Sequence, residues 1–94
     1  MKATLVTREK IRYPDGAIRE MKIWRLPRAD VERPHGFKYG LYYGRAGVRL
    51  VCYDNERGKG DHRHYSEREE PYAFESIEKT TSDFRPDVAR ERGE

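Results

Sequence analysis

The sequence predicts an α+β fold: a twisted antiparallel sheet of four to five strands, built from two successive hairpins, with one C-terminal helix packed on one face. Three observations lead to this prediction. Apolar and polar residues alternate with a period of two in the first half of the chain. Turn-forming residues interrupt that alternation, and a helical period appears only after residue 75. With 94 residues, we expect a single domain spanning 1–94.

The first hairpin is predicted within residues 2–26. Residues 2–13 alternate between two faces, which is typical of a strand. Pro14-Asp15-Gly16 then predicts a turn, because proline fixes φ and glycine tolerates a positive φ. Residues 17–26 alternate again, with Met21 and Ile23 opposed to Trp24. Two alternating runs across such a turn form a hairpin.

The second hairpin is predicted after a polar loop at 27–36, with strands at 37–43 and 48–53 around a glycine-containing turn at 44–47. A short fifth strand is predicted at 72–74. Ser76 is a suitable N-cap for a helix whose apolar face carries Ile77, Thr81, Phe84 and Val88. Pro86 lacks an N–H, so we expect it to end or kink this helix and residues 90–94 to be frayed.

Charge is distributed unevenly along the chain. Residues 1–50 hold twelve Lys/Arg and five Asp/Glu, a balance of +7, whereas residues 51–94 hold eight and twelve, a balance of −4. A basic first half suggests a surface that faces a polyanion, although solvated strand faces would give the same count. A lone cysteine, Cys52, and the absence of a membrane-length apolar run or a signal-peptide core predict a cytoplasmic protein with no membrane partner.

The segment from Tyr53 to Tyr65 is the candidate site. It interleaves two histidines with acids, cations and glycines, and such side chains are costly to desolvate unless something binds them. We predict that catalytic groups converge there at one end of the sheet, because Gly58 and Gly60 allow the chain to fold back. The candidate catalytic residues are Asp54, Lys59, Asp61, His62 and His64. Candidate nucleic-acid-binding residues are Lys38, Tyr53, Arg57 and Arg63.

Several motifs resemble the TumE family of small bacterial and archaeal proteins. They are Phe37-Lys38-Tyr39, Tyr53-Asp54-Asn55-Glu56, Gly58-Lys59-Gly60-Asp61-His62-Arg63-His64, and Tyr72-x-Phe74 ahead of the helix. The resemblance implies the toxin of a type II toxin–antitoxin pair, neutralised by a cognate antitoxin that usually carries a helix-turn-helix domain. Arg85-Pro86 departs from the family, where unbroken helical residues are expected.

Two kinds of chemistry fit the candidate segment. Metal-free RNA cleavage needs a base, an acid and cations for the phosphate, which His62, His64 and Lys59 could supply. Alternatively, His62 and His64 would point to one side of an extended chain and bind a metal with Asp54 or Asp61. A His-x-His pair is a weak metal signal by itself, so the sequence favours cleavage without a cofactor.

Two further interpretations stay open. Asp54-Asn55 is also typical of a turn in which the side chains cap the backbone. A purely structural role is therefore open to any single residue of the segment, although it explains less well why two histidines lie among so many charged residues. The function favoured by the sequence is a toxin that acts on RNA as a ribonuclease. The alternative is a non-catalytic module that binds nucleic acid or protein through its basic sheet. RNA, the helix-turn-helix antitoxin and a second copy in a homodimer are the expected partners. The aromatic run at 37–43 is expected to form an exposed surface that the antitoxin or the second copy buries.

Overall fold

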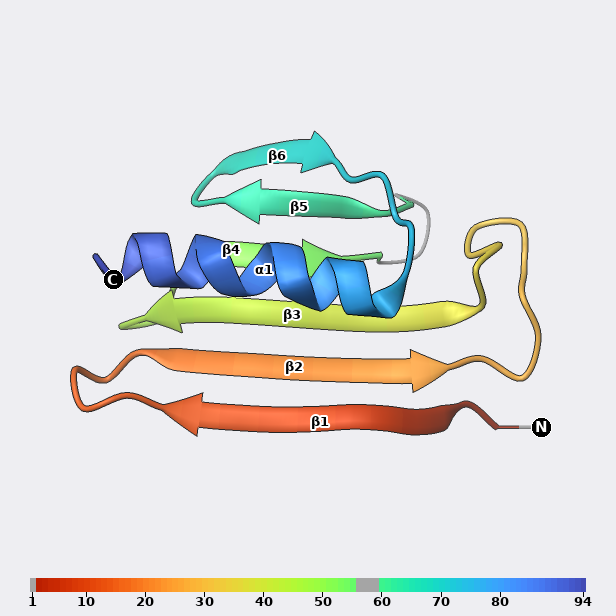
Figure 1. Ribbon diagram of the computed structural model, residues 1–94, viewed down its shortest axis with the longest axis horizontal. Coiled ribbons are helices and arrows are strands. Elements are labelled where there is room, and N and C mark those ends of the chain that lie inside the picture. The colour runs from red at the N-terminus through yellow and green to blue at the C-terminus, as the bar shows by residue number, and fades with distance from the viewer. Residues whose placement is uncertain (1, 56–59) are drawn as a thin grey trace.

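The computed structural model describes residues 2–55 and 60–94, which form one antiparallel sheet with a helix on one face (Figure 1). The described strands lie in chain order across the sheet, so each one pairs with the next. The α+β prediction is confirmed. The elements are β1 (Thr4–Arg12), β2 (Ile18–Arg25), β3 (Phe37–Arg45), β4 (Val48–Asp54), β5 (His62–Tyr65), β6 (Arg68–Pro71) and α1 (Ile77–Glu91).

The predicted strand number was too low, since the described residues form six strands. The additional pair is β5 and β6, joined by a tight turn in which Ser66 has a φ of 56°. Both strands are dominated by charged and polar residues, so they lack the apolar alternation that identifies the other strands. The fifth strand predicted at 72–74 is wrong, because the chain leaves the sheet after Pro71.

The first predicted turn is confirmed in detail. Gly16 has a φ of 87° and its N–H donates to the Tyr13 carbonyl at 3.0 Å. The Asp15 carboxylate accepts from the Ala17 N–H at 3.0 Å, so the turn residues close their own backbone bonds. In the next hairpin, Ala46 and Gly47 both have positive φ, the requirement of the two-residue turn whose twist matches the strands.

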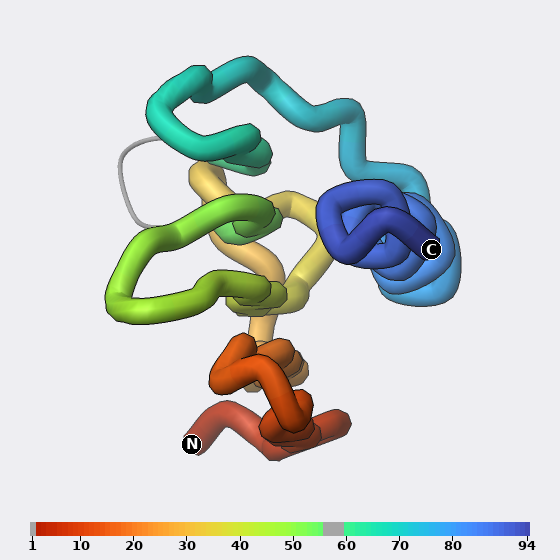
Figure 2. Tube along the Cα trace, turned by 90° about the vertical axis from the view of Figure 1, so that its left-hand side faces the viewer, coloured from red at the N-terminus to blue at the C-terminus, as the bar shows by residue number. Residues whose placement is uncertain are grey.

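The core lies between the sheet and α1, which covers the middle strands on one face only (Figure 2). Alternate residues of the strands point to it because side chains change face at every position. Phe84 of α1 is fully buried and its ring meets the edge of Tyr53 at a centroid distance of 5.7 Å. The buried apolar residues are Ala17, Met21, Ile23, Tyr39, Leu41, Tyr43, Val51, Tyr53, Phe84 and Val88.

The helix begins as predicted but does not end as predicted. The Ser76 hydroxyl accepts from the Lys79 N–H at 3.0 Å, which satisfies one free donor of the first turn. Pro86 lies inside the helix, which continues to Glu91, and Arg92 still bonds to the Val88 carbonyl. Pro86 is exposed, so the carbonyl that loses its partner can be solvated by water. No helix in the described part of the chain could cross a membrane.

The aromatic strand β3 is internal, between β2 and β4. We expected its aromatic residues to form an exposed dimer or antitoxin surface, but Tyr39 and Tyr43 are buried against α1. The strands that end the described sheet are β1 and β6. A homodimer therefore stays a prediction, and an added strand would pair with one of these edges rather than with β3.

Candidate active site

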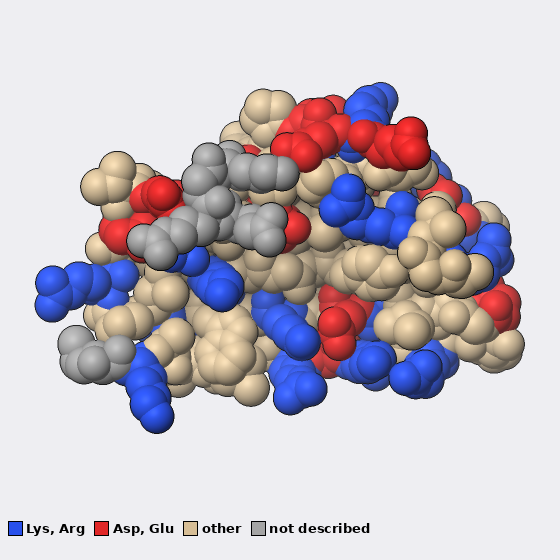
Figure 3. Space-filling model, turned by 180° about the vertical axis from the view of Figure 1, so that it is seen from behind, with Lys and Arg blue, Asp and Glu red and all other residues tan. Residues whose placement is uncertain are grey.

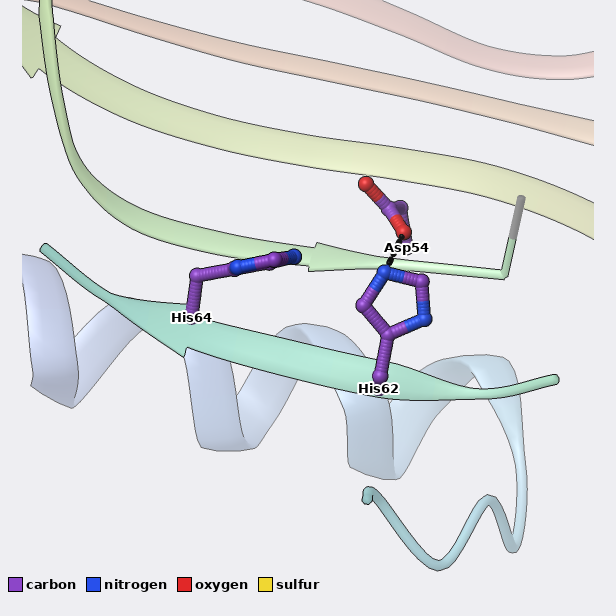
Figure 4. A group of neighbouring side chains, drawn as sticks. All are labelled: Asp54, His62 and His64. Carbon is purple, nitrogen blue, oxygen red and sulfur yellow. Dashed lines mark ion pairs between the residues drawn. The ribbon is translucent and has the colours of Figure 1, made fainter. Parts of the chain in front are cut away.

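Asp54, His62 and His64 come together on the face of the sheet opposite α1, called the open face below (Figure 4). Asp54 ends β4 and His62 begins β5, and the two are direct partners in the antiparallel register. His64 lies two residues further along β5, so its side chain leaves the strand on the same side. One nitrogen or oxygen atom from each residue lies within 4.8 Å of the others. These three residues are called the Asp-His-His cluster.

The imidazole of His62 lies between two oxygen atoms. Its Nδ1 lies 2.9 Å from the Gly60 carbonyl oxygen, and its Nε2 lies 2.5 Å from Asp54 Oδ1. The side chains of His62 and Asp54 are 5% and 24% exposed, so water reaches the carboxylate more easily than the ring. The Gly60 contact makes Nδ1 the donor atom, so a neutral His62 ring has its lone pair on Nε2, the ring nitrogen near Asp54.

His64, the third residue of the cluster, is a buried residue of β5. The residue is 4% exposed, and its ring meets the His62 ring edge-on at a centroid distance of 4.9 Å. Burial, together with the nearby positive charge of Arg49, lowers the pKa of His64 below its usual value. Both effects favour the neutral ring, the form in which an imidazole can accept a proton or bind a metal ion.

A hollow of about 400 Å³ opens beside the cluster, between β2, β3 and β4. Gly40 forms part of it and is the direct partner of Asp54 in the neighbouring strand. A Cβ on Gly40 would meet nothing within 4 Å, so the missing side chain leaves this space open. The lining residues are Glu20, Lys22, Trp24, Lys38, Tyr39, Gly40, Leu41, Tyr42, Cys52, Asp54 and Asn55.

Tyr42 reaches its place beside the hollow because its neighbour on the same face is a glycine. A Cβ on Gly44 would lie 2.2 Å from the Tyr42 hydroxyl, so the Tyr42 ring runs across the bare backbone of Gly44. Any larger residue at position 44 would displace the phenol. Tyr42 and Trp24 thus offer aromatic surface next to the Asp-His-His cluster, and Lys22 and Lys38 offer positive charge.

The open face is basic. Figure 3 shows Lys and Arg side chains spread over the face that looks away from α1. The strand register explains the pattern, because Arg8 pairs with the hollow-lining Lys22 and Lys10 pairs with Glu20. Residues that are direct partners in a sheet project to the same side. The excess positive charge of residues 1–50 is thus partly concentrated on the face that carries the cluster.

Asn55 fixes the end of β4. The residue is 2% exposed, its Oδ1 accepts from the Tyr39 N–H at 3.1 Å, and its Nδ2 donates to the Phe37 carbonyl at 2.7 Å. The Asn55 side chain thus makes the hydrogen bonds to the β3 backbone that the β4 backbone no longer makes where β4 ends. The sequence predicted that Asn55 could cap the backbone of its own turn. Its side chain does cap backbone groups, but those of the neighbouring strand β3. It holds Asp54 beside the hollow.

Asp61 is not brought to the cluster. Its carboxylate accepts from the Tyr39 hydroxyl at 2.7 Å and lies 3.0 Å from His35 Nε2. His35 in turn stacks on Phe74 at a centroid distance of 3.8 Å, and its Nδ1 accepts from the Phe37 N–H. Because Tyr39 is part of the core under α1, Asp61 lies on the face opposite the cluster. Its role in the structure is to tie the loop at 27–36 to the start of β5.

The other predicted residues fall into three groups. Lys38 lines the hollow. Arg57 and Lys59 lie outside the described residues. Tyr53 and Arg63 lie on the α1 face, where Tyr53 is 0% exposed and bonds to Asp87, and Arg63 Nε bonds to Glu70 at 2.5 Å. A fully buried tyrosine cannot stack on a base, so we leave Tyr53 and Arg63 out of the proposed interface.

Lys22, Gly40 and Trp24 line the hollow but are not among the candidate residues that the sequence predicts. Trp24 is half-buried. The alternation of side chains between the two faces of a strand could have identified them. Trp24, Lys22 and Glu20 alternate with the core residues Met21 and Ile23, so they had to share the other face.

Comparison with known proteins gives a family for the chain. The family model described as "Toxin TumE" matches residues 2–92 of the 94. A search of curated proteins found no match, and a search of solved structures found none either. The matched range contains every strand, the helix and the whole Asp-His-His cluster. The chain therefore belongs to the toxin TumE family.

Proposed function

We propose that this TumE-family protein is the toxin of a type II toxin–antitoxin pair and that it acts on RNA as a ribonuclease. The toxin role is supported by the family match over residues 2–92. The observation that carries the ribonuclease proposal is the position of the Asp-His-His cluster at the hollow of a basic, aromatic-containing face. Titratable groups can transfer the protons of RNA cleavage, and positive charge and stacking surface can bind the RNA.

The substrate would lie along the open face. Phosphates would contact the lysines and arginines of β1, β2 and β3, and one base would enter the hollow against Trp24 or Tyr42. The volume of about 400 Å³ is within the range of about 300–1,000 Å³ of small-molecule pockets. Bases of single-stranded RNA are unstacked and can enter such a space, whereas those of a duplex cannot. We therefore propose single-stranded RNA as the substrate class.

The reaction centre would be the Asp-His-His cluster. Cleavage at the 2′-hydroxyl forms a bond from that oxygen to phosphorus and breaks the bond from phosphorus to the 5′-oxygen, with one proton removed and one supplied. The residue types of the cluster can serve this reaction either as proton-transfer groups or as ligands of a metal ion. In both cases Asp54 and the two histidines are required, and the same variants test the proposal.

A growth assay in a bacterial host tests the function. Induction of the wild-type chain should stop growth, and co-expression of the cognate antitoxin, expected from an adjacent helix-turn-helix gene, should restore it. The His62→Ala, His64→Ala double variant should be harmless but still bind the antitoxin. His35→Gln, at the third histidine on the other face, is the matched control and should stay toxic.

The outcomes separate catalysis from binding. A soluble double variant that still stops growth would favour the non-catalytic binding module, with the basic face holding nucleic acid or a protein. Asp54→Asn gives a nearly isosteric second variant, for use if removing two buried imidazoles prevents folding. Normal growth at high soluble expression of the wild-type chain would contradict the toxin role itself.

A further inference from the structure

Asp54 Oδ1 and His62 Nε2 are both atoms with lone pairs, and they face each other at 2.5 Å. Two such atoms repel unless a cation lies between or beside them. A proton on Nε2 would satisfy the pair if the N–H pointed at the oxygen. Yet Oδ1 is buried and accepts no hydrogen bond from any residue in the described part of the chain. The oxygen therefore lies beside the Nε2 lone-pair axis rather than on it.

Two ligands that share a metal ion also lie beside each other's lone-pair axes, at a wider spacing than this pair has without an ion. Each ligand atom lies about 2.0–2.1 Å from a zinc ion, so neighbouring ligand atoms are about 3.4 Å apart and neither points directly at the other. We propose that Asp54, His62 and His64 bind a divalent first-row transition-metal ion, such as Zn²⁺ or Mn²⁺. The three ligand atoms lie within 4.8 Å of one another, and binding of an ion would widen the 2.5 Å contact between Asp54 and His62 to ligand spacing.

The surroundings of the His62 ring support this proposal. Its Nδ1 lies 2.9 Å from the Gly60 carbonyl, which fixes the tautomer that leaves Nε2 free to bind a metal. Metal-binding histidines ordinarily use their second nitrogen in this way, and the contact orients the ring. In Figure 4, the rings of His62 and His64 both come from β5, and the His64 ring extends along the strand toward His62 and Asp54.

The burial and number of the ligands indicate the class of ion. His62 and His64 are each 4% exposed, and the Nδ1 atom of His64 is buried, makes no hydrogen bond among the described residues and lies 3.7 Å from Glu69 Oε2. Two imidazoles with one carboxylate suit Zn²⁺, Mn²⁺ or Fe²⁺, whereas Mg²⁺ and Ca²⁺ require oxygen ligands. Three protein ligands leave a coordination position open, as in catalytic rather than structural zinc sites.

The open position would face the hollow, because Asp54 lines it. An ion there could polarise a phosphate oxygen or activate water. That role in cleavage rests on the proposed ribonuclease function, but binding of the ion does not. With this assignment the cofactor-free scheme favoured by the sequence gives way to a metal-dependent one, since both histidines become ligands.

Metal binding by the purified full-length chain tests the proposal without RNA. After removal of metals with EDTA, titration with Zn²⁺ should give one bound ion per chain by calorimetry and raise the melting temperature. Co²⁺ should give the visible d–d absorption of an imidazole-bound ion, and Mg²⁺ should give no stabilisation. Asp54→Asn, His62→Ala and His64→Ala should each weaken binding by more than the about 10- to 100-fold typical of an outer-shell change.

His35→Gln is the control, because His35 also contacts a carboxylate, Asp61, but on the opposite face. It should bind Zn²⁺ as the wild type does. The proposal is overturned if the wild type binds no ion, or if the three cluster variants bind as tightly as His35→Gln, which would place the ion elsewhere. A chain that binds Zn²⁺ at the cluster but does not cleave RNA would contradict the ribonuclease proposal and leave the metal site standing.

Discussion

Asp54 and His62 face each other across the β4–β5 ladder as direct register partners, with Oδ1 of one 2.5 Å from Nε2 of the other. The pair joins the ends of two strands whose connection includes residues 56–59, outside the described part of the chain. Its position depends only on backbone pairing, because β4 and β5 are hydrogen-bonded neighbours. Groups placed by strands are held more firmly than groups placed by loops, which suits a reaction centre.

Filling the hollow should weaken RNA binding without loss of stability. Gly40→Val adds a side chain whose Cβ would meet nothing within 4 Å, and a β-branched residue favours a strand. We expect binding of a single-stranded RNA oligonucleotide to weaken at least about tenfold, which corresponds to about 1.4 kcal/mol. The melting temperature should stay the same or rise.

The control for the hollow is Thr4→Val, which places the same side chain at an exposed position of β1. It should leave RNA binding unchanged. Equal RNA affinity for Gly40→Val and wild type would exclude the hollow as part of the interface.

Removing charge from the hollow should change the salt dependence of RNA binding. Lys22 and Lys38 line the hollow on β2 and β3. If each contacts one phosphate, Lys22→Gln with Lys38→Gln should reduce the slope of log K against log salt by about 1.4, because each contact to a single strand contributes about 0.7. Binding at low salt should weaken with it, as measured by fluorescence anisotropy.

The matched pair is Arg68→Gln with Arg85→Gln, which removes the same charge from exposed positions on β6 and α1. If this pair lowers the slope as much as the hollow pair, the effect is general electrostatics, and the open face is not the specific RNA surface.

The amide of Asn55 should be important for stability. Asn55→Ala removes two hydrogen bonds and leaves the Tyr39 N–H and the Phe37 carbonyl without that partner beside the buried residue. Unsatisfied buried backbone groups cost about 1–3 kcal/mol, so we expect the free energy of unfolding to fall by about 2–3 kcal/mol. Urea denaturation measures this directly. A change below about 0.5 kcal/mol, the ordinary range for surface positions, would show that the amide does not hold β3 to β4.

Acid should remove the contribution of Asp83 to stability. The Tyr72 hydroxyl, which donates to Asp83 at 2.6 Å, and the Lys79 ammonium lower the pKa of Asp83 below its usual 3.8. A lowered folded-state pKa stabilises the fold above the unfolded value, and the stabilisation is lost as the pH falls through the folded value. Asp83→Asn should therefore reduce stability at pH 7 by about 1 kcal/mol.

The difference between wild type and Asp83→Asn should shrink as the pH is lowered below 3.8. Glu91→Gln, at an exposed position near the end of the same helix, serves as the comparison in the same pH series. A difference for Asp83→Asn that is constant from pH 7 to pH 2 would show that the charge of Asp83 does not stabilise the fold.

Part of this structure could be predicted from local sequence. The hairpin around Pro14-Asp15-Gly16 and the helix start at Ser76 follow from residues that set their own backbone geometry. Strands β5 and β6 could not be recognised, because pairing with β4, rather than an apolar pattern, makes His62–Tyr65 a strand. The expectation that Pro86 could end the helix was wrong. A proline leaves one helix carbonyl without a hydrogen bond, and tertiary packing decides whether that carbonyl can bond to water instead.

The positions of the candidate-site residues could also be predicted only in part. Alternation along an extended chain predicts that His62 and His64 share one face, and the structure places them so. The position of Asp61 could not be predicted, because its partners Tyr39 and His35 lie 22 and 26 residues away. The hollow required the register of three strands, since Lys22, Gly40 and Asp54 become neighbours only when β2, β3 and β4 pair.

The most direct test of the central claim is cleavage of a labelled single-stranded RNA by the purified chain, compared between wild type, Asp54→Asn, the His62→Ala, His64→Ala double variant and His35→Gln. The account predicts cleavage by the wild type and by His35→Gln. It predicts a loss of at least about 100-fold in rate for the two cluster variants, the lower end of the effect of a proton-transfer group. Cleavage at the wild-type rate by folded Asp54→Asn and double-variant proteins would contradict the assignment of the reaction centre.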